Sequence, residues 1–533
     1  MTVVTEAPAA AVPPARPEPP TAPAVLARRR VRADRPLLLG LTAFAALAHG
    51  VNFGAGPVFG ADEGTYLAQA WAVREGIGLA HYTYWYDHPP FGWIQLAALG
   101  WLPDLVLSGS PALVAGRAAM MVFALTSVVL LYLVARRLRL APWAAATAVA
   151  LFVLSPLALA LHRQVYLDNI AVTWLLGALL LALSRRRHLW HYIGAGGCAA
   201  GAVLSKETIL LAVPAVALAI WRCSHRSTRA FCLTGFVAAF VLTLSVYPLY
   251  AALKGELMPG DGHVSLLGAA FHQVAGRHSS GSVFDVGSDS YRTVDAWLYQ
   301  DPVIVLAGAA ASALALTVRR LRAPAVAAMV ISLMGLRPGG YLPAMHIAQA
   351  LPFYALCLAG LAHTAVVLFR RGAWAPPRLR LPVRLAALAL AGALALAVGV
   401  SWHDGNRRLW RDDANAEYAA AGRWVRDHVH ADGTRIVVDD ALWPDMVRAG
   451  FNPGTGAIWF YKLDLDPAVM IHLPGGWRDL HYVVVTPMMR QRPAGLPTLT
   501  EAITRSDVVA AFGEGEERIE VRRVHADLRE ATP

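Results

Sequence analysis

The segment 61-ADEGTYLAQAWAVREGIGLAHYTYWYDHPPFGWIQLA-97 follows directly on the first strongly apolar stretch of the chain. It opens with two adjacent carboxylates, Asp62 and Glu63, and continues through the aromatic run HYTYWY to an acid and a histidine before two prolines. Placing an ionisable group beside a lipid bilayer costs free energy, so carboxylates at the end of an apolar helix indicate a functional site. The segment therefore predicts a functional loop next to a membrane-spanning helix.

Composition supports the membrane assignment. Hydrophobic residues make up 56% of the 533 residues and charged residues only 16%, unlike a soluble globular protein. Apolar runs close to the roughly 20 residues that cross a hydrocarbon core recur along the chain, and we expect a polytopic α-helical membrane protein with about eleven spans. The expected spans are residues 36–53, 112–135, 141–161, 169–183, 190–204, 209–221, 230–253, 302–318, 323–336, 342–368 and 385–402.

Basic residues predict the orientation, because Lys and Arg that flank short loops stay on the cytoplasmic side. Clusters such as RRRVRADR, RRLRL and SRRRH precede the first expected span and follow the even-numbered ones. We expect residues 1–35 to form a disordered cytoplasmic tail and the loop at 54–111 to lie outside, in a multi-pass plasma-membrane protein. The net charge of +11 then comes mostly from the basic loops on the cytoplasmic side. Because the arginines are spread over separate loops, they do not indicate nucleic-acid binding.

After the last expected span the composition becomes that of a soluble domain, and we expect residues 403–533 to form a small extracytoplasmic α/β domain. Residues 416–429 have helical periodicity, 435–440 and 481–486 are typical of buried strands, and 517–524 alternate like a half-exposed strand. The chain contains no GxGxxG, GKS or GKT sequence. The four cysteines all fall in or near spans, so no disulfide framework is expected.

The candidate site residues lie at the outer ends of the expected spans, where topology brings them to one face. They are Asp62, Glu63, Asp87, His88, Arg163, Asp168, Lys206, Glu207, Arg337 and Tyr341. Each has a structural alternative. The acids could cap helices, Arg163 and Asp168 could form an ion pair between spans, and Lys206 could extend to the interface. The aromatic run could be an interfacial belt, and Tyr341 is more often a belt residue than a ligand.

The motifs in combination resemble the GT-C membrane glycosyltransferases, and in particular the protein O-mannosyltransferases and lipid A aminoarabinose transferases. The resemblance covers residues 36–365 and rests on the first-loop Asp-Glu pair and on DHPPFGW, HRQVYLDN, LSKE and YLPAMHIAQALPF. It implies that Asp62, with Glu63 beside it, is the catalytic base. The aminoarabinose transferases carry a Lys before the two prolines to hold the carrier phosphate, whereas this chain has His88, so that role passes to Lys206, Arg163 or Arg337.

The resemblance implies an inverting glycosyltransferase that takes a sugar from a polyprenyl-phosphate donor in the bilayer to an acceptor hydroxyl on a glycan, protein or lipid. The base removes the acceptor proton and cations stabilise the departing phosphate. Asp168 would orient Arg163 or the acceptor. The scheme requires no metal, although the outer carboxylates and His88 leave a divalent ion open. The alternatives are a transporter or lipid flippase, and a non-catalytic scaffold whose outer domain binds partners.

Overall fold

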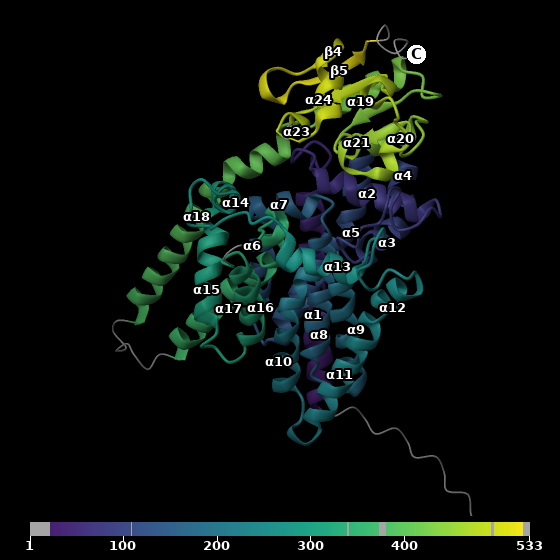
Figure 1. The fold of residues 1–533 in the computed structure, drawn as a ribbon. Coiled ribbons are helices and arrows are strands. Elements are labelled where there is room, and N and C mark those ends of the chain that lie inside the picture. Colours follow the sequence, from purple (N-terminus) through teal and green to yellow (C-terminus); the bar gives the residue numbers. More distant parts are fainter. Residues whose placement is uncertain (1–21, 108, 338–339, 372–379, 492–494, 526–533) are drawn as a thin grey trace, which may run out of the picture.

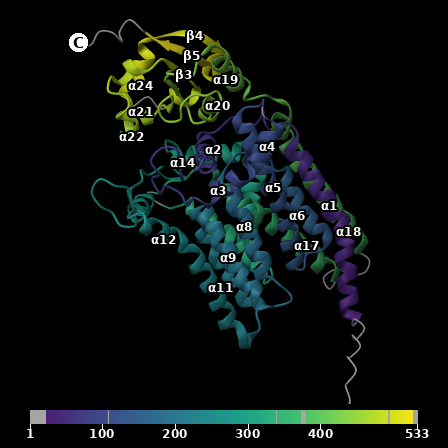
Figure 2. The ribbon, with the colours of Figure 1, turned by 90° about the vertical axis from the view of Figure 1, so that its right-hand side faces the viewer.

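The fold was analysed in a computed structural model that describes residues 22–107, 109–337, 340–371, 380–491 and 495–525. A helical bundle forms one end of the molecule and a small C-terminal domain with a β-sheet forms the other, as Figures 1 and 2 show from two directions. We call the small domain the outer domain, after the side of the membrane on which the sequence predicts it. The first loop, residues 54–111, lies between the bundle and this domain and contacts both.

The bundle is built from thirteen helices in the described residues. They are α1 (Ala22–Gly50), α5 (Ala112–Arg137), α6 (Pro142–Leu154), α7 (Pro156–Arg163), α8 (Leu167–Ala182), α9 (Leu189–Ser205), α10 (Val213–Cys223), α11 (Arg229–Leu244), α12 (Val246–Leu253), α15 (Gly308–Ala315), α16 (Arg322–Met334), α17 (Leu351–Arg371) and α18 (Arg380–Arg411). Shorter elements connect them: α2 (Ala61–Arg74), α3 (Phe91–Leu99), α4 (Trp101–Val106), η1 (Glu207–Ala212), η2 (Arg226–Thr228), α13 (Leu266–Phe271), η3 (His272–Gly276), α14 (Asp289–Gln300), η4 (Val303–Ala307) and η5 (Ala344–Gln349).

Every expected span falls largely on helical structure, but the count of eleven crossings is not confirmed. In the described ranges, four helices are long and apolar enough to cross a membrane, or up to six if each of two bent pairs is one span. One such pair is α6 and α7, which meet at an angle of 67°. The bend has a local cause, because Pro156 opens α7 and the Ser155 hydroxyl caps it by accepting from the Ala158 amide.

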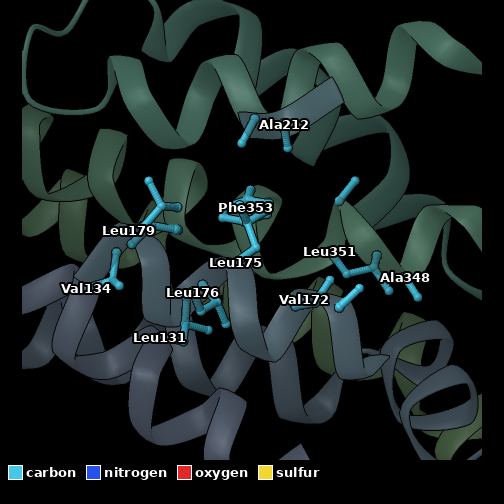
Figure 3. Packing of buried hydrophobic residues seen from close by; sticks show 14 of the residues in the cluster. Leu131, Val134, Val172, Leu175, Leu176, Leu179, Ala212, Ala348, Leu351 and Phe353 are labelled. Atoms are coloured by element: carbon cyan, nitrogen blue, oxygen red, sulfur yellow. The ribbon is translucent and has the colours of Figure 1, made fainter. Parts of the chain in front are cut away.

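Close packing holds the bundle together, since apolar lipid tails offer little hydrophobic driving force between helices. The buried leucines of α8 meet residues of α5 and α17 in one cluster, in which Figure 3 shows Leu175, Leu176, Leu131 and Phe353. Small residues allow other helices to approach still closer. A Cβ added to Gly196 of α9 would lie 2.2 Å from the carbonyl oxygen of Phe236 in α11, so only glycine fits there.

Helix α18 differs from the others because its apolar middle is exposed, as is typical of a helix surrounded by lipid. Its end nearest the outer domain is anchored, since the Trp402 indole donates to Asp301 Oδ1 at 2.8 Å and the Asn406 amide to the Leu154 carbonyl at 2.9 Å. It continues to Arg411, past the boundary at 402 expected from composition. At the other terminus α1 begins at Ala22, within the expected tail, whose residues 1–21 lie outside the described ranges.

The outer domain carries a mixed five-stranded sheet in the order β2-β1-β3-β5-β4. Strands β2, β1 and β3 are parallel to one another, and β5 pairs antiparallel with β3 and β4. Its elements are α19 (Ala416–His428), β1 (Ile436–Val438), α20 (Trp443–Arg448), β2 (Ala457–Trp459), α21 (Lys462–Leu465), α22 (Pro467–Met470), η7 (Gly476–Asp479), β3 (Tyr482–Val485), α23 (Pro487–Arg490), α24 (Pro497–Thr504), β4 (Ser506–Phe512), η8 (Gly515–Glu517) and β5 (Ile519–Val524). The helix and three strands expected from the sequence are all present, and β2 and β4 complete the sheet.

Candidate active site

The two adjacent acids of the first loop lie in the first turn of α2, where the helix dipole favours negative charge. The Gly60 amide donates to Glu63 Oε1 at 3.1 Å and closes the turn as half of a capping box. Successive residues of a helix point in different directions. Asp62 is therefore half-buried beside the other candidate residues, whereas Glu63 points into the protein.

Glu63 is fully buried and its carboxylate is used entirely in structural contacts. Arg117 of α5 holds both oxygens, donating from Nη2 to Oε1 at 2.7 Å and from Nε to Oε2 at 2.9 Å. The Gln164 amide group and the Val165 backbone amide complete the shell at 3.2 and 3.0 Å. A bidentate pair of this kind fixes the position of α2 against the bundle. This geometry favours a positioning role for Glu63.

Lys206 lies at the centre of the candidate residues. It ends α9 and is buried, and its ammonium nitrogen lies 3.0 Å from Nε2 of His88. The other ring nitrogen of His88, Nδ1, lies 3.0 Å from Oε2 of Glu207. An ammonium can only donate, so Nε2 accepts and Nδ1 carries the proton given to Glu207. The break between α9 and η1 thus places Lys206, His88 and Glu207 in one chain of hydrogen bonds.

Negative charge surrounds this lysine. Burial alone would lower its pKa, but the carboxylates of Glu207, Asp168, Asp62 and Asp87 outweigh that effect and raise the pKa of Lys206. Burial likewise opposes ionisation of Glu207, yet His88 and Lys206 lower the pKa of Glu207 to about 2. Both shifts favour the charged forms of the two side chains, a cation at Lys206 and an anion at Glu207. The acids that act on Lys206 come from three separate outer segments of the chain.

Asp168 is buried in the first turn of α8 and accepts a hydrogen bond of 2.6 Å from Gln349 Nε2. Gln349 also donates to the Thr208 hydroxyl at 2.6 Å and so joins η5 to α8 and η1. The second carboxylate oxygen of Asp168 has no partner among the described residues. Sequence reasoning missed Gln349, because a glutamine within YLPAMHIAQALPF carries no charge to mark it.

Three of the candidate residues are engaged elsewhere. The Arg163 guanidinium donates to the Ala48, Val51 and Leu409 carbonyls at 2.9, 2.7 and 2.9 Å, which ties the ends of α1 and α18 together. It does not pair with Asp168. Arg337 is exposed and donates to the Val274 carbonyl at 2.7 Å. Tyr341 packs against the Arg277 guanidinium, 3.8 Å from its ring centre. These contacts favour Lys206 over both arginines as the cation of the site.

The outer domain closes over α2 at the same place. A Cβ at Gly64 would lie 1.9 Å from the Asp440 carbonyl oxygen, so glycine permits backbone contact between α2 and the residue two positions after β1. The Thr65 and Tyr461 hydroxyls each donate to Oδ1 of Asp440 at 2.9 Å. Burial and the carboxylates of Asp439 and Asp62 raise the pKa of Asp440 to about 7. The only sequence signal for Asp440 was the pair of acids that ends RIVVDD.

The aromatic run of the first loop has mixed surroundings. Tyr84 donates to the His88 carbonyl at 2.6 Å and Tyr86 to Glu256 Oε2 at 2.6 Å, so these hydroxyls order the loop. Trp85 is 45% exposed. Lys462 lies 5.4 Å from the ring centre of Tyr82 and 5.6 Å from that of Trp85. The segment 458-IWFYKLDLDPAV-469 therefore contacts the aromatic loop, and this contact could not be predicted from its sequence.

Among the described residues, no group of His, Cys, Asp and Glu is arranged to hold a metal ion.

The chain resembles known proteins in sequence over part of its length and in fold over most of it. The family described as "Dolichyl-phosphate-mannose-protein mannosyltransferase" matches residues 87–249, a segment that includes Asp87, His88, Asp168 and Lys206. A search of curated proteins finds no match in sequence.

Among solved structures, ArnT from Cupriavidus metallidurans bound to undecaprenyl phosphate has a TM-score of 0.56 at 14% identity, over 93% of this chain and 99% of that one. Its apo state has a TM-score of 0.57 at 14% identity, over 94% of this chain and 100% of that one. The archaeal oligosaccharyltransferase AglB from Archaeoglobus fulgidus, in complex with an inhibitory peptide and a dolichol-phosphate, has a TM-score of 0.52 at 14% identity over 91% and 74%. At this identity the likeness establishes a shared fold.

The resemblance to GT-C membrane glycosyltransferases predicted from the sequence is confirmed by the family match and the common fold. The class of enzyme is confirmed with it, a glycosyltransferase that uses a lipid-phosphate sugar. The chain has an ArnT-like helical bundle with an outer mixed sheet.

Proposed function

We propose that this enzyme transfers a sugar, with inversion at its anomeric carbon, from a polyprenyl-phosphate donor to an acceptor hydroxyl at the outer face of the plasma membrane. The observation that carries the proposal is the buried Lys206 ammonium, which lies beside His88 and within the field of Asp62. One site therefore contains a cation and a half-buried carboxylate at the end of the bundle that adjoins the outer domain. The complexes of ArnT and AglB with polyprenyl phosphates support a donor of the same kind.

In the proposed reaction Asp62 accepts the proton of the acceptor hydroxyl as its oxygen attacks the anomeric carbon. The bond between that carbon and the phosphate oxygen breaks on the opposite side, and the lipid phosphate leaves with the bonding electrons. The Lys206 ammonium stabilises the developing negative charge. His88 and Glu207 hold the ammonium in place through the hydrogen bonds on either side of the imidazole ring. The Asp87 carboxylate accepts a hydrogen bond of 2.9 Å from the His88 backbone amide and so orders the loop around His88.

The first experiment is to incubate purified protein in detergent with polyprenyl-phosphate mannose, arabinose and glucose, and to measure released polyprenyl phosphate. We expect release from one donor, and its loss in Asp62→Asn. The matched control is Glu75→Gln, which removes an exposed carboxylate just past the other end of α2. An Asp62→Asn protein with normal turnover would contradict the assignment of the base.

One observation supports the alternative function of a transporter. Two pairs of apolar helices are bent, and transporters form their binding sites from discontinuous helices. Detergent solution separates the two functions. Transport needs two compartments, whereas sugar transfer does not. Absence of donor consumption by folded protein supplied with candidate acceptors would favour the transporter.

A further inference from the structure

The connection between α10 and α11 lies at the end of the bundle opposite to the outer domain (Figure 1). A pocket lies around this connection. Its volume is about 560 Å³ and six of its eight lining residues are basic. The lining consists of Arg187, Trp221, Arg222, Ser224, His225, Arg226, Arg229 and Arg319. These residues come from three separate connections, between α8 and α9, between α10 and α11, and between α15 and α16, and from the adjoining ends of α10 and α11. The positive-inside rule requires basic residues on one side of the membrane, but it does not require them to line one pocket, as they do here.

The charge of this site is unbalanced. Its lining contains no carboxylate. Burial lowers the pKa of Arg222, and repulsion from Arg322 outside the lining and Arg319 within it lowers this pKa further. Arg222 also donates to the Arg319 carbonyl at 2.6 Å, so the basic side chains are held near one another by the fold itself. A cluster of this kind is stabilised by an anion that sits among its members.

Buried polar atoms at the site lack partners of their own. Ser224 is 6% exposed, and its hydroxyl has no hydrogen-bond partner in the described part of the chain. The same holds for Nε of Arg229. The Arg229 guanidinium is oriented by the Trp221 ring, whose centre lies 4.5 Å away. Leaving a buried donor unsatisfied is costly, and an oxyanion would accept from both groups.

We propose that this pocket binds the phosphate group of an anionic phospholipid in the leaflet opposite to the active site. Arginine is suited to this ligand because its planar fork donates to two phosphate oxygens at once. Trp221 is 51% exposed, and Trp190 at the start of α9 is also exposed, as is typical of tryptophans at the level of lipid headgroups. Basic pockets between membrane helices are a known mode of headgroup recognition. The lipid tails then lie along the outer surface of the helices.

The test uses the full chain in nanodiscs that contain phosphatidylcholine alone or mixed with phosphatidylglycerol, and counts retained lipids by native mass spectrometry. The test variant is the double substitution Arg187→Gln and Arg226→Gln, since both side chains are exposed and contribute little to folding. The control is Arg370→Gln, an exposed basic residue at the end of α17 outside the pocket. We expect wild type and control to retain phosphatidylglycerol selectively, and the affinity to fall roughly fivefold for each pocket arginine removed.

A third arm adds inorganic phosphate, which should compete with phosphatidylglycerol for the wild-type protein. Equal retention of the two lipids, or unchanged retention by the double variant, would overturn the proposal. Stabilisation by inorganic phosphate without retention of phosphatidylglycerol would also overturn it, because the ligand would then be a soluble phosphate compound. These outcomes are independent of sugar transfer.

Discussion

At the scale of single residues, the two neighbouring acids of α2 have different surroundings and should respond differently to substitution. Glu63 accepts hydrogen bonds from Arg117, Gln164, Val165 and Gly60, whereas Asp62 faces the cluster around Lys206. Glu63 therefore stabilises the fold, and Asp62 is the acid that we propose as the base. Both acids lie in the first turn of α2, where the side chains of successive residues point in different directions.

Replacing Glu63 by Gln leaves the Arg117 guanidinium buried without a counter-charge. Breaking a buried ion pair in this way costs roughly 3–5 kcal/mol, so we expect the thermal unfolding midpoint to fall clearly below that of wild type and of Asp62→Asn. Differential scanning fluorimetry in detergent measures this. A Glu63→Gln protein that is as stable as wild type but inactive would instead assign Glu63 to the reaction.

Replacing Lys206 by Met removes the proposed phosphate cation while keeping an unbranched side chain that is one atom shorter. Loss of one group that stabilises developing charge typically lowers turnover by about 10²–10³. Release of polyprenyl phosphate at saturating donor measures the effect, and Lys206→Arg should restore part of the rate. The control is Lys254→Met on an exposed outer segment. Equal turnover in the two Met variants would remove Lys206 from the mechanism.

At the scale of elements, the contact between α2 and the end of β1 determines how the outer domain is seated. Residues on the carboxyl side of β1, notably Asp440, meet α2 through the backbone at Gly64 and through the Thr65 hydroxyl. Without a side chain at Gly64 the two elements approach closely enough for both contacts. The sheet therefore has a fixed position over the loop that carries Asp62.

Replacing Gly64 by Ala places a Cβ 1.9 Å from the Asp440 carbonyl oxygen, which forces the outer domain away from α2. We expect faster proteolytic cleavage between α18 and α19 and reduced turnover, as judged by limited trypsin digestion and the donor-release assay. The control is Gly399→Ala in α18, where nothing lies within 4 Å of the added methyl group. Identical digestion of both variants would show that α2 and the outer domain are not in close contact.

At the scale of the whole molecule, pH should govern how firmly the two parts associate. Asp440, buried between them, has a pKa raised to about 7, chiefly by burial, then by Asp439 and Asp62, while Thr65 and Tyr461 counteract in part. An acid with a raised pKa binds its proton more tightly in the folded state, so stability falls as pH rises from about 4 to about 7. We expect a lower unfolding midpoint at pH 8 than at pH 5, and a weaker dependence in Asp440→Asn. An unchanged pH dependence in that variant would place the responsible group elsewhere.

Much of this architecture could be predicted from the sequence, and the failures have physical causes. Apolar runs located the helices and the buried strands β1 and β3, and a period-two alternation located β5, because each pattern reflects the burial of a single element. The number of membrane crossings could not be predicted from the sequence, because a helix break such as that at Ser155 and Pro156 lies within a continuous apolar run. Charge near the bilayer was the reason to propose the first-loop acids, His88, Asp168, Lys206 and Glu207 as site residues, and the structure brings Asp62, Asp168 and His88 near Lys206. The backbone carbonyls that Arg163 contacts belong to helix ends distant in sequence, so these contacts could not be predicted from the sequence.

The contact between Gly64 and Asp440 also has a consequence for biosynthesis. The ribosome makes α2 early and β1 only after every helix of the bundle, so the loop carrying Asp62 is without its final partner for most of translation. A nascent chain inserted in the membrane has its acids and Lys206 but lacks the domain that covers them. The loop that carries Asp62 gains this contact only after the helices of the bundle have been made and the domain that contains β1 folds against α2.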